Sequence, residues 1–580
     1  MLRMEKIIMN VAICALNSQY IHSALAPWCL LAGINAYGDT NKINASILEG
    51  TINESDEAVL QRIEALQPDV VSFCTYIWNV TMVLRLTKEL KKRFPKLKLI
   101  LGGPEVAYCA EKVLMENPEI DFILSGEGEY PYPMLLMELL KDVPQYKTVP
   151  GICFKTQKGT YFISEPYLPK EDPVSPYCDA YFEQLNGRLA YLETSRGCPY
   201  SCAFCLSGRC GGARFFDIEE AKKNMVNLAN SGAKTIKLVD RTFNADKKRA
   251  YTLFSFIISE YGKRIPAGVC FHFEIAGDIL DDAMISLLNS APKGAIQLEI
   301  GLQSFNEETL AAVTRKTNIK RLTENITKLL LPRNIHVHID LIAGLPYEGL
   351  ESFKESFNTA YALKPDMLQF GFLKLLHGAP MRENAERYPC VYSKEPPYEV
   401  QETPWLSKEE FHLLKQAESV FDKLYNSGRF LRTIAYAMET IEIKPFDLFL
   451  QFAQYLSTVV ECPEHSMPLD TYTNFLFAFL SGFSKVDSEI LRDVMICDRF
   501  ATNSSNILPQ NLKRKDANLK KVKQYVNANI PFKLPKHGKR SIAILYGQKA
   551  VVYADYTELP NPVTREYDLH FMPFSSFTTS

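Results

Sequence analysis

The sequence has 580 residues, which is too long for one domain and predicts about three or four. Hydrophobic residues make up 47% and charged residues 23%, as in ordinary soluble globular proteins, and 14 cysteines are too few for a disulfide scaffold of this length. The formal net charge of −2 gives no indication of a nucleic-acid or membrane partner. Because no long apolar run and no signal-peptide pattern occur, we expect a cytoplasmic protein without a membrane span.

The first part of the chain, residues 1–160, alternates predicted strands and helices. Apolar runs rich in β-branched residues predict strands at 7–16, 44–50, 70–76, 97–103 and 121–129. Helical spacing of apolar residues predicts the intervening helices, such as 55–69 and 79–95. Near-continuous apolar strands separated by helices indicate a parallel sheet covered on both faces, so this part is predicted to be a doubly wound α/β domain.

Domains of this kind bind ligands at the carboxyl ends of their strands. The loops expected there are 17–23, 72–78, 102–108 and 126–129. Glycine permits a close approach of the backbone to a ligand. The candidate contacts in these loops are Ser72, Gly102, Gly103, Gly126 and Gly128.

A second βα series follows a proline-marked linker at residues 161–187. It covers residues 188–385, with strands predicted at 189–195, 235–240, 269–275, 295–302, 336–344 and 367–376. Helical patterns such as 217–232 and 318–331 separate these strands. Six βα repeats indicate a barrel or part of one, with its chemistry at the C-terminal ends of the strands.

The last part, residues 386–580, is predicted to be mainly helical, with strand-like segments at 541–547 and 550–556. Residues 513–540 contain ten Lys or Arg and a single acidic residue. Such a segment would attract a phosphate-bearing substrate or RNA, although a solvated basic face explains it more simply. The predicted fold is therefore α/β: a Rossmann-like domain, a partial (β/α)6 barrel and a mainly helical C-terminal domain.

Four cysteines follow the first predicted barrel strand closely. Cys198, Cys202 and Cys205 have C-x3-C-x2-C spacing, and Cys210 comes five residues later. Structural zinc usually takes cysteine pairs from two separated places, and no second CxxC occurs, so zinc would need Cys210 as its last ligand. A disulfide is atypical of a cytosolic chain. Three thiolates on one loop instead suit three irons of a [4Fe-4S] cluster and leave the fourth iron open.

The pattern C-x3-C-x-aromatic-C, with Phe204 as the aromatic residue, resembles the radical S-adenosylmethionine (SAM) superfamily over about residues 188–380. The resemblance implies that the amino and carboxylate groups of SAM chelate the open iron. It also implies that an electron from the cluster splits SAM and produces a 5′-deoxyadenosyl radical, which abstracts a substrate hydrogen. Cys210 lies outside this pattern and is expected to be a loop residue.

Polar residues near successive strand ends extend the resemblance. The segment "KLVDRTFN" at 237–244 is similar to the second-strand segment of the superfamily, which implies that Asp240 helps to hold the SAM amino group. Glu274, Gln303, Arg315 and Asp340 match in type and spacing the SAM-binding residues of oxygen-independent coproporphyrinogen III oxidase. Arginine suits the methionine carboxylate, and carboxylates or amides suit the ribose hydroxyls.

A doubly wound domain before such a barrel resembles the cobalamin-binding subgroup, which includes radical methyltransferases and an anaerobic Mg-protoporphyrin cyclase. The resemblance implies that the 102–108 and 126–129 loops contact cobalamin. The D-x-H-x-x-G signature of the lower cobalt ligand is absent, and the corresponding loop reads "NSQYIHSAL" with His22 in another position. The lower ligand is then missing, a water molecule or His22.

The main hypothesis is a radical SAM enzyme that uses a [4Fe-4S] cluster, SAM and cobalamin to methylate an unreactive carbon. The alternatives are a cyclase or rearrangement enzyme with the same cofactors, an RNA-modifying radical SAM enzyme, and a non-catalytic iron–sulfur or zinc module. We expect a small-molecule substrate, which this sequence does not identify, and an electron donor such as flavodoxin or ferredoxin.

Overall fold

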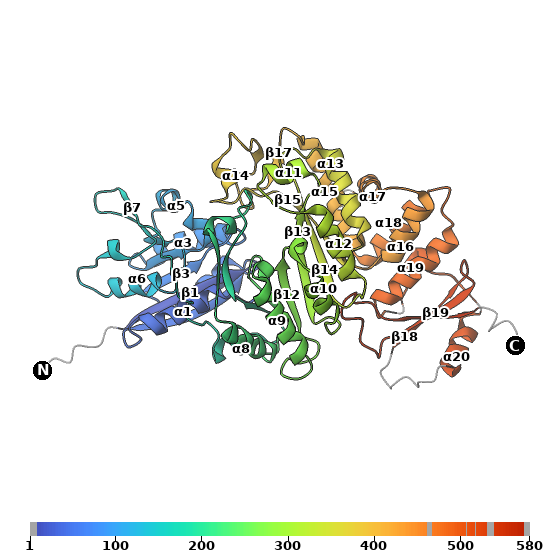
Figure 1. The fold of residues 1–580 in the computed structure, drawn as a ribbon, viewed down its shortest axis with the longest axis horizontal. Helices are drawn as coiled ribbons and strands as arrows, with labels where there is room; N and C mark the ends of the chain where they lie inside the picture. Colours follow the sequence, from blue (N-terminus) through green and yellow to red (C-terminus); the bar gives the residue numbers. More distant parts are fainter. Residues whose placement is uncertain (1–7, 461–466, 506, 517, 530–538, 574–580) are drawn as a thin grey trace. The chain divides into compact units, whose positions relative to one another are not determined.

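The computed structural model describes residues 8–460, 467–505, 507–516, 518–529 and 539–573, and only the backbone of Cys210. The chain, whose helices and strands are labelled in Figure 1, divides into two compact units. Unit 1 comprises Met1–Ala276, Val313–Lys316 and Leu373–Thr403. Unit 2 comprises Gly277–Ala312, Thr317–Phe372 and Pro404–Ser580.

The N-terminal sheet of unit 1 has the strand order β2-β1-β3-β4-β5-β6-β7. Its first five strands are parallel, whereas β6 and β7 continue the sheet in antiparallel fashion. The strands are β1 (Met9–Asn17), β2 (Ile43–Thr51), β3 (Val70–Cys74), β4 (Lys98–Gly102), β5 (Phe122–Leu124), β6 (Ile152–Lys155) and β7 (Tyr161–Ile163). The predicted doubly wound parallel sheet is confirmed, and β7 carries it slightly past residue 160.

Helices cover both faces of this sheet. One apolar cluster joins α1 (Ala26–Tyr37) and α6 (Pro131–Leu139) to the sheet, and a second joins α2 (Asp56–Ala65), α3 (Val80–Arg93) and α5 (Ala110–Glu116). The short helix α4 (Pro104–Ala107) follows β4. In α3, the buried residues Val83, Leu86 and Leu90 recur at helical spacing, which explains why this segment folds as a helix on the sheet.

The strand order places a topological switch between β1 and β3, since β2 lies beyond β1 and β4 beyond β3. Ligands of doubly wound sheets bind outside the carboxyl ends of the strands at such a switch. The loops that begin at Asn17 and Thr75 flank this position. They are joined there, because Trp78 Nε1 and Asn79 Nδ2 both donate to the Leu16 carbonyl oxygen, at 3.1 and 3.0 Å.

Six strands of the barrel region follow in chain order, with three parallel strands in each unit. In unit 1, β8 (Leu189–Leu192) pairs with β11 (Thr235–Leu238), and β11 pairs with β12 (Cys270–Ile275). In unit 2, β13 (Ile296–Gln303) pairs with β14 (His336–Ala343), and β14 pairs with β15 (Met367–Phe372). The intervening helices are α8 (Ile218–Ala229), α9 (Lys247–Glu260), α10 (Asp282–Asn289), α11 (Glu307–Ala312), α12 (Ile319–Leu330) and α13 (Leu350–Ala362). All six predicted strands of this series are therefore present.

Two parts of unit 1 contain short elements that the sequence pattern does not predict. Strand β9 (Ser195–Cys198) and strand β10 (Gly212–Phe215) form an antiparallel hairpin that includes the end of the predicted strand 189–195. The segment Leu373–Thr403, which we call the returning segment, contains α14 (Pro380–Glu383) and the strand pair β16 (Val391–Tyr392) and β17 (Val400–Glu402). The predicted linker 161–187 contains the short helix α7 (Asp179–Phe182).

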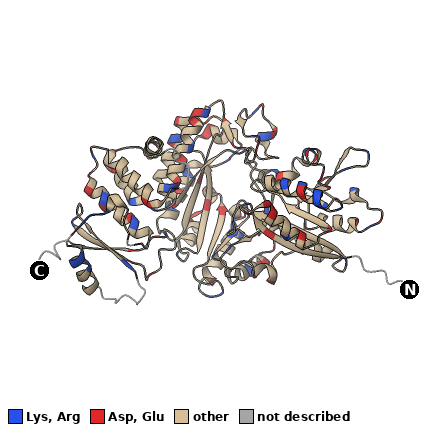
Figure 2. Ribbon diagram, turned by 180° about the vertical axis from the view of Figure 1, so that it is seen from behind, with Lys and Arg blue, Asp and Glu red and all other residues tan. Residues whose placement is uncertain are grey.

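The C-terminal part is mainly helical, as predicted, and ends in a three-stranded antiparallel sheet. Its elements are α15 (Lys408–Phe421), α16 (Leu431–Ile441), α17 (Pro445–Val459), α18 (Leu469–Ser481), α19 (Ser488–Thr502), α20 (Leu519–Asn529), β18 (Arg540–Leu545), β19 (Ala550–Asp555) and β20 (Leu569–Pro573). Both signs of charge occur along the helices of each unit (Figure 2). Part of the basic segment 513–540 lies outside the described residues. In the described part of the chain, the helices are too short or too polar to cross a membrane.

Candidate functional site

The three cysteines lie on a loop that the β9–β10 hairpin closes. Cys198 is the last residue of β9 and is the register partner of Gly212 in β10. Gly197 and Gly211 have φ angles of 91° and 68°, a region that favours glycine, so the chain can turn sharply at both ends of the loop. None of the three thiols forms a disulfide. The sequence thus folds into one loop that presents three free thiols directly after β8.

The surroundings of the thiols suit a site for a thiolate-bound metal. Cys202 is 5% exposed, and Arg315 Nη1 lies 3.8 Å from its Sγ atom. Burial raises the pKa of the Cys202 thiol, while the neighbouring guanidinium acts in the opposite direction. Cys198 Sγ lies 3.4 Å from the Thr242 hydroxyl, and Cys205 is half-buried. Soft thiolate donors on one loop fit an iron–sulfur cluster.

Two later segments of the chain hold the backbone of this loop. The Ala203 N–H donates to the Val313 carbonyl oxygen, and the Met381 N–H donates to the Ala203 carbonyl oxygen, both at 3.0 Å. Thr314 Oγ1 also donates to the Ser201 carbonyl oxygen, at 2.5 Å. These bonds fix the chain between Cys202 and Cys205, where the half-buried Phe204 lies. Cys210 is part of a 3-10 turn, and its side chain is outside the description.

Asp240 lies beside the same loop but is engaged by the protein. Its buried carboxylate accepts hydrogen bonds from the Thr194 N–H at 2.9 Å, Thr194 Oγ1 at 2.6 Å and Ser195 Oγ at 2.7 Å. Burial raises its pKa, and these three donors oppose the rise. In this arrangement Asp240 positions the chain that leads into β9; a contact with the SAM amino group stays a prediction.

The other predicted SAM contact residues of unit 1 form separate polar contacts. Glu274, on β12, lies 3.9 Å from Lys237 Nζ and 3.7 Å from Arg241 Nη1. Arg315 lies over the Tyr200 ring, at 5.6 Å from its centroid, in addition to its contact with Cys202. The structure thus places Arg315 against the cysteine loop itself.

In unit 2, Gln303 and Asp340 lie on neighbouring strands. Gln303 follows a register shift in β13 and has a φ angle of 75°, and its buried Oε1 atom has no hydrogen-bond partner among the described residues. Asp340 Oδ1 lies 2.8 Å from His338 Nε2, and Glu299 Oε2 lies 4.0 Å from His338 Nδ1. A buried amide oxygen without a partner and a strained backbone are features of ligand sites.

His338 and Glu299 were not among the predicted site residues. The available signal was the alternation along the predicted strand, since His336, His338 and Asp340 occupy every second position and side chains at such positions share one face of a strand. Glu299 and His338 are register partners on the neighbouring parallel strands β13 and β14, a pairing that the sequence pattern does not reveal.

The candidate residues of the N-terminal loops differ in the space around them. A β-carbon added at Gly102 would meet, among the described residues, the Leu124 carbonyl oxygen at an ordinary 3.5 Å, which leaves room above the end of β4. At Gly103, with φ of 107°, it would lie 2.3 Å from the Thr75 carbonyl oxygen. Gly126 and Gly128 are likewise closely packed by their own unit. The Ser72 hydroxyl is buried against the Tyr132 hydroxyl, 2.7 Å away, so it faces the protein.

The 17–23 loop is attached to the first barrel strand. His22 forms a bridge with Leu189, and its Nδ1 atom lies 2.7 Å from the Tyr191 hydroxyl. Burial lowers the pKa of His22, and Lys237 and Arg188 act in the same direction. One ring nitrogen of His22 is therefore used within the protein. On the other side of the topological switch, Trp78 is 45% exposed and stacks on Tyr76, with ring centroids 4.5 Å apart.

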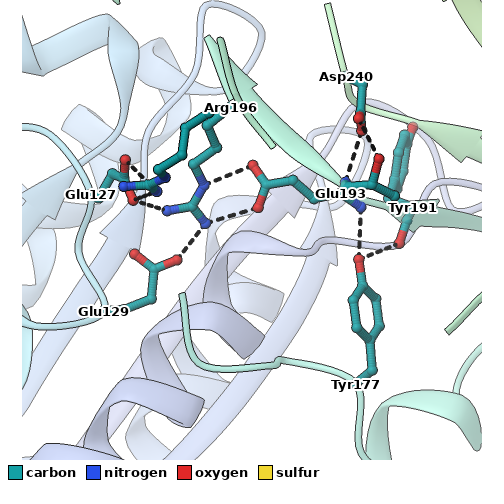
Figure 3. A network of polar contacts seen from close by, with 9 residues as sticks. Glu127, Glu129, Tyr177, Tyr191, Glu193, Arg196 and Asp240 are labelled. Carbon is teal, nitrogen blue, oxygen red and sulfur yellow. Dashed lines mark hydrogen bonds and ion pairs between the residues drawn. The ribbon is translucent and has the colours of Figure 1, made fainter. Parts of the chain in front are cut away.

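A partly buried charge network connects the 126–129 loop with the strand that leads to Cys198 (Figure 3). Arg196, on β9, donates to Glu127, Glu129 and Glu193. The Glu193 N–H donates to Tyr177 Oη at 2.8 Å, which extends the network into the predicted linker. No residue of this network except Asp240, shown beside it, was a predicted site residue. The sequence shows the glutamates of "GEGE" and the arginine of "TSRGCP", but only the tertiary fold brings these residues together.

Comparison with known protein families assigns three regions of the chain. Residues 15–136 match the B12 binding domain, and residues 192–360 match the radical SAM superfamily. Residues 386–536 match a family described as protein of unknown function (DUF4080). The resemblance inferred from the sequence is thus confirmed, and the C-terminal part matches a family whose name records no activity.

Individual relatives agree with this domain order. The cobalamin-dependent radical SAM methyltransferase TokK of Streptomyces tokunonensis is 28% identical over 347 residues, which is 56% of this chain and 50% of TokK. The cobalamin-dependent SAM radical enzyme OxsB has a TM-score of 0.59 at 14% identity, over 91% of this chain and 82% of OxsB. The radical SAM methyltransferase TsrM of Kitasatospora setae has a TM-score of 0.55 at 17% identity, over 67% of this chain and 79% of TsrM.

The chain spans about half the length of the curated relative TokK. At identities of 14% and 17%, the likeness to OxsB and TsrM shows a shared fold.

Proposed function

We propose that the chain, whose residues 192–360 match the radical SAM superfamily and whose residues 15–136 match the B12 binding domain, is a cobalamin-dependent radical SAM methyltransferase. The names of TokK and TsrM, which are methyltransferases with the same pair of features, support methyl transfer over a cyclase or rearrangement reaction. A non-catalytic metal-binding module does not account for two cofactor domains in one chain.

One observation carries the proposal: three free thiols lie on a single hairpin-closed loop directly after the first barrel strand. Cys198, Cys202 and Cys205 would hold a [4Fe-4S] cluster with one iron open to SAM. The cluster would supply the electron that cleaves SAM, and cobalamin would supply the methyl group. Within the protein, Arg315 lies against Cys202 and Thr242 against Cys198, so both side chains would border a cluster bound by these thiols.

The remaining site residues have proposed roles in cofactor binding. Glu274, Gln303, Arg315 and Asp340 would contact SAM, and the unpartnered Oε1 of Gln303 supports such a role. Cobalamin would lie over the carboxyl ends of the N-terminal strands, where Gly102 leaves space. Because His22 Nδ1 is bonded to the Tyr191 hydroxyl, Nε2 is the ring nitrogen that would bind cobalt if His22 is the lower ligand. Ser72 would act through Tyr132 and not by direct contact.

The proposed substrate is a small molecule, and TsrM offers a precedent because one of its structures contains tryptophan. A flavodoxin or ferredoxin in the cytoplasm would serve as the electron donor. The basic segment in the C-terminal part leaves RNA as a second possible substrate, but no described contact favours it.

Anaerobic reconstitution tests the cluster assignment. The wild-type protein should bind about four irons per chain, the content of one [4Fe-4S] cluster. Cys202→Ala should lose most of this iron and all formation of 5′-deoxyadenosine. Cys178→Ala, which removes an exposed cysteine outside the loop, is the matched control and should behave as wild type. Zinc in place of iron, or full iron binding by Cys202→Ala, would contradict the assignment.

The reaction itself requires a product assay. The reconstituted protein, hydroxocobalamin, a reductant and SAM with a deuterated methyl group are added to a cell extract. A metabolite that gains the labelled methyl group identifies the substrate. A substrate consumed without gain of label would show that the enzyme is a cyclase or rearrangement enzyme, and a labelled RNA would identify an RNA methyltransferase.

A further inference from the structure

The hairpin that closes the cysteine loop carries two arginines opposite each other. Arg196 on β9 and Arg214 on β10 are register partners. Directly opposite residues of an antiparallel pair point to the same face, and two like charges in such positions repel each other. The hairpin is therefore stable only if negative groups lie against this face.

Three glutamates meet this requirement. Glu127 accepts hydrogen bonds from both arginines, and its oxygens lie 2.7 and 3.0 Å from Arg214 Nη2. Glu129 Oε1 lies 2.5 Å from Arg196 Nη2, and the two oxygens of Glu193 lie 2.8 Å from Arg196 Nε and Nη2. The guanidinium group of Arg196 is thus enclosed by three carboxylates, as Figure 3 shows.

These contacts are partly shielded from water. The side chains of Arg196, Glu127 and Glu129 are 18%, 25% and 9% exposed. Charge-assisted, bidentate hydrogen bonds of arginine have a narrow geometry. Removal of one partner from a shielded network leaves an uncompensated charge, which is far more costly than loss of an exposed ion pair. The network therefore holds its two ends in one relative position.

The two ends belong to the two parts of unit 1 where cofactors are proposed to bind. Glu127 and Glu129 lie in the loop at the carboxyl end of β5, within the region that matches the B12 binding domain. Arg196 lies two residues before Cys198. From this arrangement we infer that Arg196 is a positioning residue that couples cobalamin binding at the 126–129 loop to assembly of the cluster on the cysteine loop.

This inference rests on the proposed function, since it requires that both cofactors bind. Coupling between two binding sites is reciprocal: if the cluster strengthens cobalamin binding, cobalamin strengthens retention of the cluster by the same factor. Measured couplings of this kind are typically about 5-fold to 150-fold. We expect the assembled cluster to tighten binding of hydroxocobalamin by at least about 5-fold in the wild-type protein.

The experiment compares the Kd for hydroxocobalamin of full-length protein with and without the reconstituted cluster. Arg196→Gln and Glu127→Gln should each bring the ratio of the two Kd values close to one. Arg188→Gln is the matched control. Arg188 forms a similarly buried ion pair with Glu49, at 2.6 Å, between the N-terminal sheet and the start of β8, and its hydrogen bonds go to Glu49 and to the Tyr20 and His22 carbonyl oxygens, outside the Arg196 network. It should keep the wild-type ratio.

The possible outcomes separate the inference from the proposed function. A wild-type ratio near one, with both cofactors bound, overturns the coupling and leaves the proposed function intact. A wild-type ratio above about 5 that persists in both network variants overturns the role of Arg196. If wild-type protein binds no cobalamin or assembles no cluster, the proposed function fails. Loss of coupling in Arg188→Gln as well would show a general effect of weakened packing and would also contradict the inference.

Discussion

Glu348 is a carboxyl group that the fold buries completely. It follows β14 in unit 2, and its Oε1 atom accepts hydrogen bonds from Ser304 Oγ at 2.6 Å and Ser356 Oγ at 2.9 Å. Its Oε2 atom has no partner among the described residues. Burial raises the pKa of Glu348 from 4.5 to about 7, against the effect of the two serines. The folded protein therefore binds this proton more tightly than the unfolded chain does.

This difference predicts how the free energy of unfolding depends on pH. A group whose pKa is higher in the folded state costs no stability below the unfolded pKa, and its cost grows as the pH rises from about 4.5 to about 7. Glu348→Gln keeps the acceptor for both serines but cannot ionise. Relative to wild type it should gain stability across this interval, by about 3 kcal/mol in total. Urea unfolding at pH 5 and pH 8 measures the gain, and an equal difference at both pH values would contradict the prediction.

At the scale of elements, the returning segment holds the cysteine loop and the 102–108 loop together. Besides the bond from Met381 to Ala203, Arg209 Nη1 donates to the Gly378 carbonyl oxygen at 2.6 Å. Tyr398 donates through its hydroxyl to the buried Glu105 of α4. Burial raises the pKa of Glu105, and the hydrogen bond from Tyr398 opposes this. The segment thus contacts the chain at both proposed cofactor loops of unit 1.

Gly378 offers a test of this packing. It has a φ angle of 83°, and a β-carbon there would lie 2.3 Å from the Tyr108 ring. Gly378→Ala should weaken packing of the segment by about 1–3 kcal/mol through strain and overlap. Gly187→Ala is the matched control, because φ is 73° and nothing lies within 4 Å of the added carbon. Hydrogen exchange of the Met381 amide should become at least about fivefold faster in Gly378→Ala only, since 1.4 kcal/mol corresponds to a factor of ten and about 1 kcal/mol to a factor of about five. Equal rates in both variants would show that the overlap has no effect on the segment.

The sequence predicted the elements whose patterns are local. Long apolar strands such as β1 and β14, and amphipathic helices such as α3, follow from periodicity within each segment. The hairpin β9–β10 could not be predicted, because its strands have four residues each, are rich in glycine and arginine, and pair across a long loop. Strands β6 and β7 are not predicted by the sequence pattern, because they are short and only partly buried.

The candidate site likewise contains residues that a local pattern predicts and residues whose role depends on the tertiary fold. The three cysteines were found because a dense spacing of one residue type is a local signal. Arg196 was missed because its role depends on Glu127 and Glu129, nearly seventy positions earlier. The packing of Ser72 against Tyr132 was missed for the same reason, since a sequence shows which hydroxyl is available but not what covers it.

At the scale of the whole molecule, the boundary between the units does not follow the family boundaries. Unit 2 contains strands β13–β15 together with the C-terminal helices. An aromatic core explains this: Phe357 of α13 contacts Phe421 of α15 and Phe446 of α17, with ring centroids 4.9 and 5.5 Å apart, and Phe370 of β15 joins the same cluster. Removal of the C-terminal part would expose this surface to water.

This shared core predicts that the second half of the barrel series depends on the C-terminal helices for its stability. Phe446 is 1% exposed, and Phe446→Ala should lower the free energy of unfolding of unit 2 by about 3–5 kcal/mol, as for other buried phenylalanines. Val459→Ala, at a 43% exposed position at the end of the same helix, is the control and should cost less than about 1 kcal/mol.

Hydrogen exchange followed by peptide analysis resolves where the stability is lost. Protection should fall together in β13–β15 and in α15 and α17, because one cooperative core connects them. If Phe446→Ala weakened protection in the C-terminal helices alone and left β14 and β15 unchanged, the C-terminal part would be an independent domain. The aromatic contacts would then not contribute to the stability of the barrel strands.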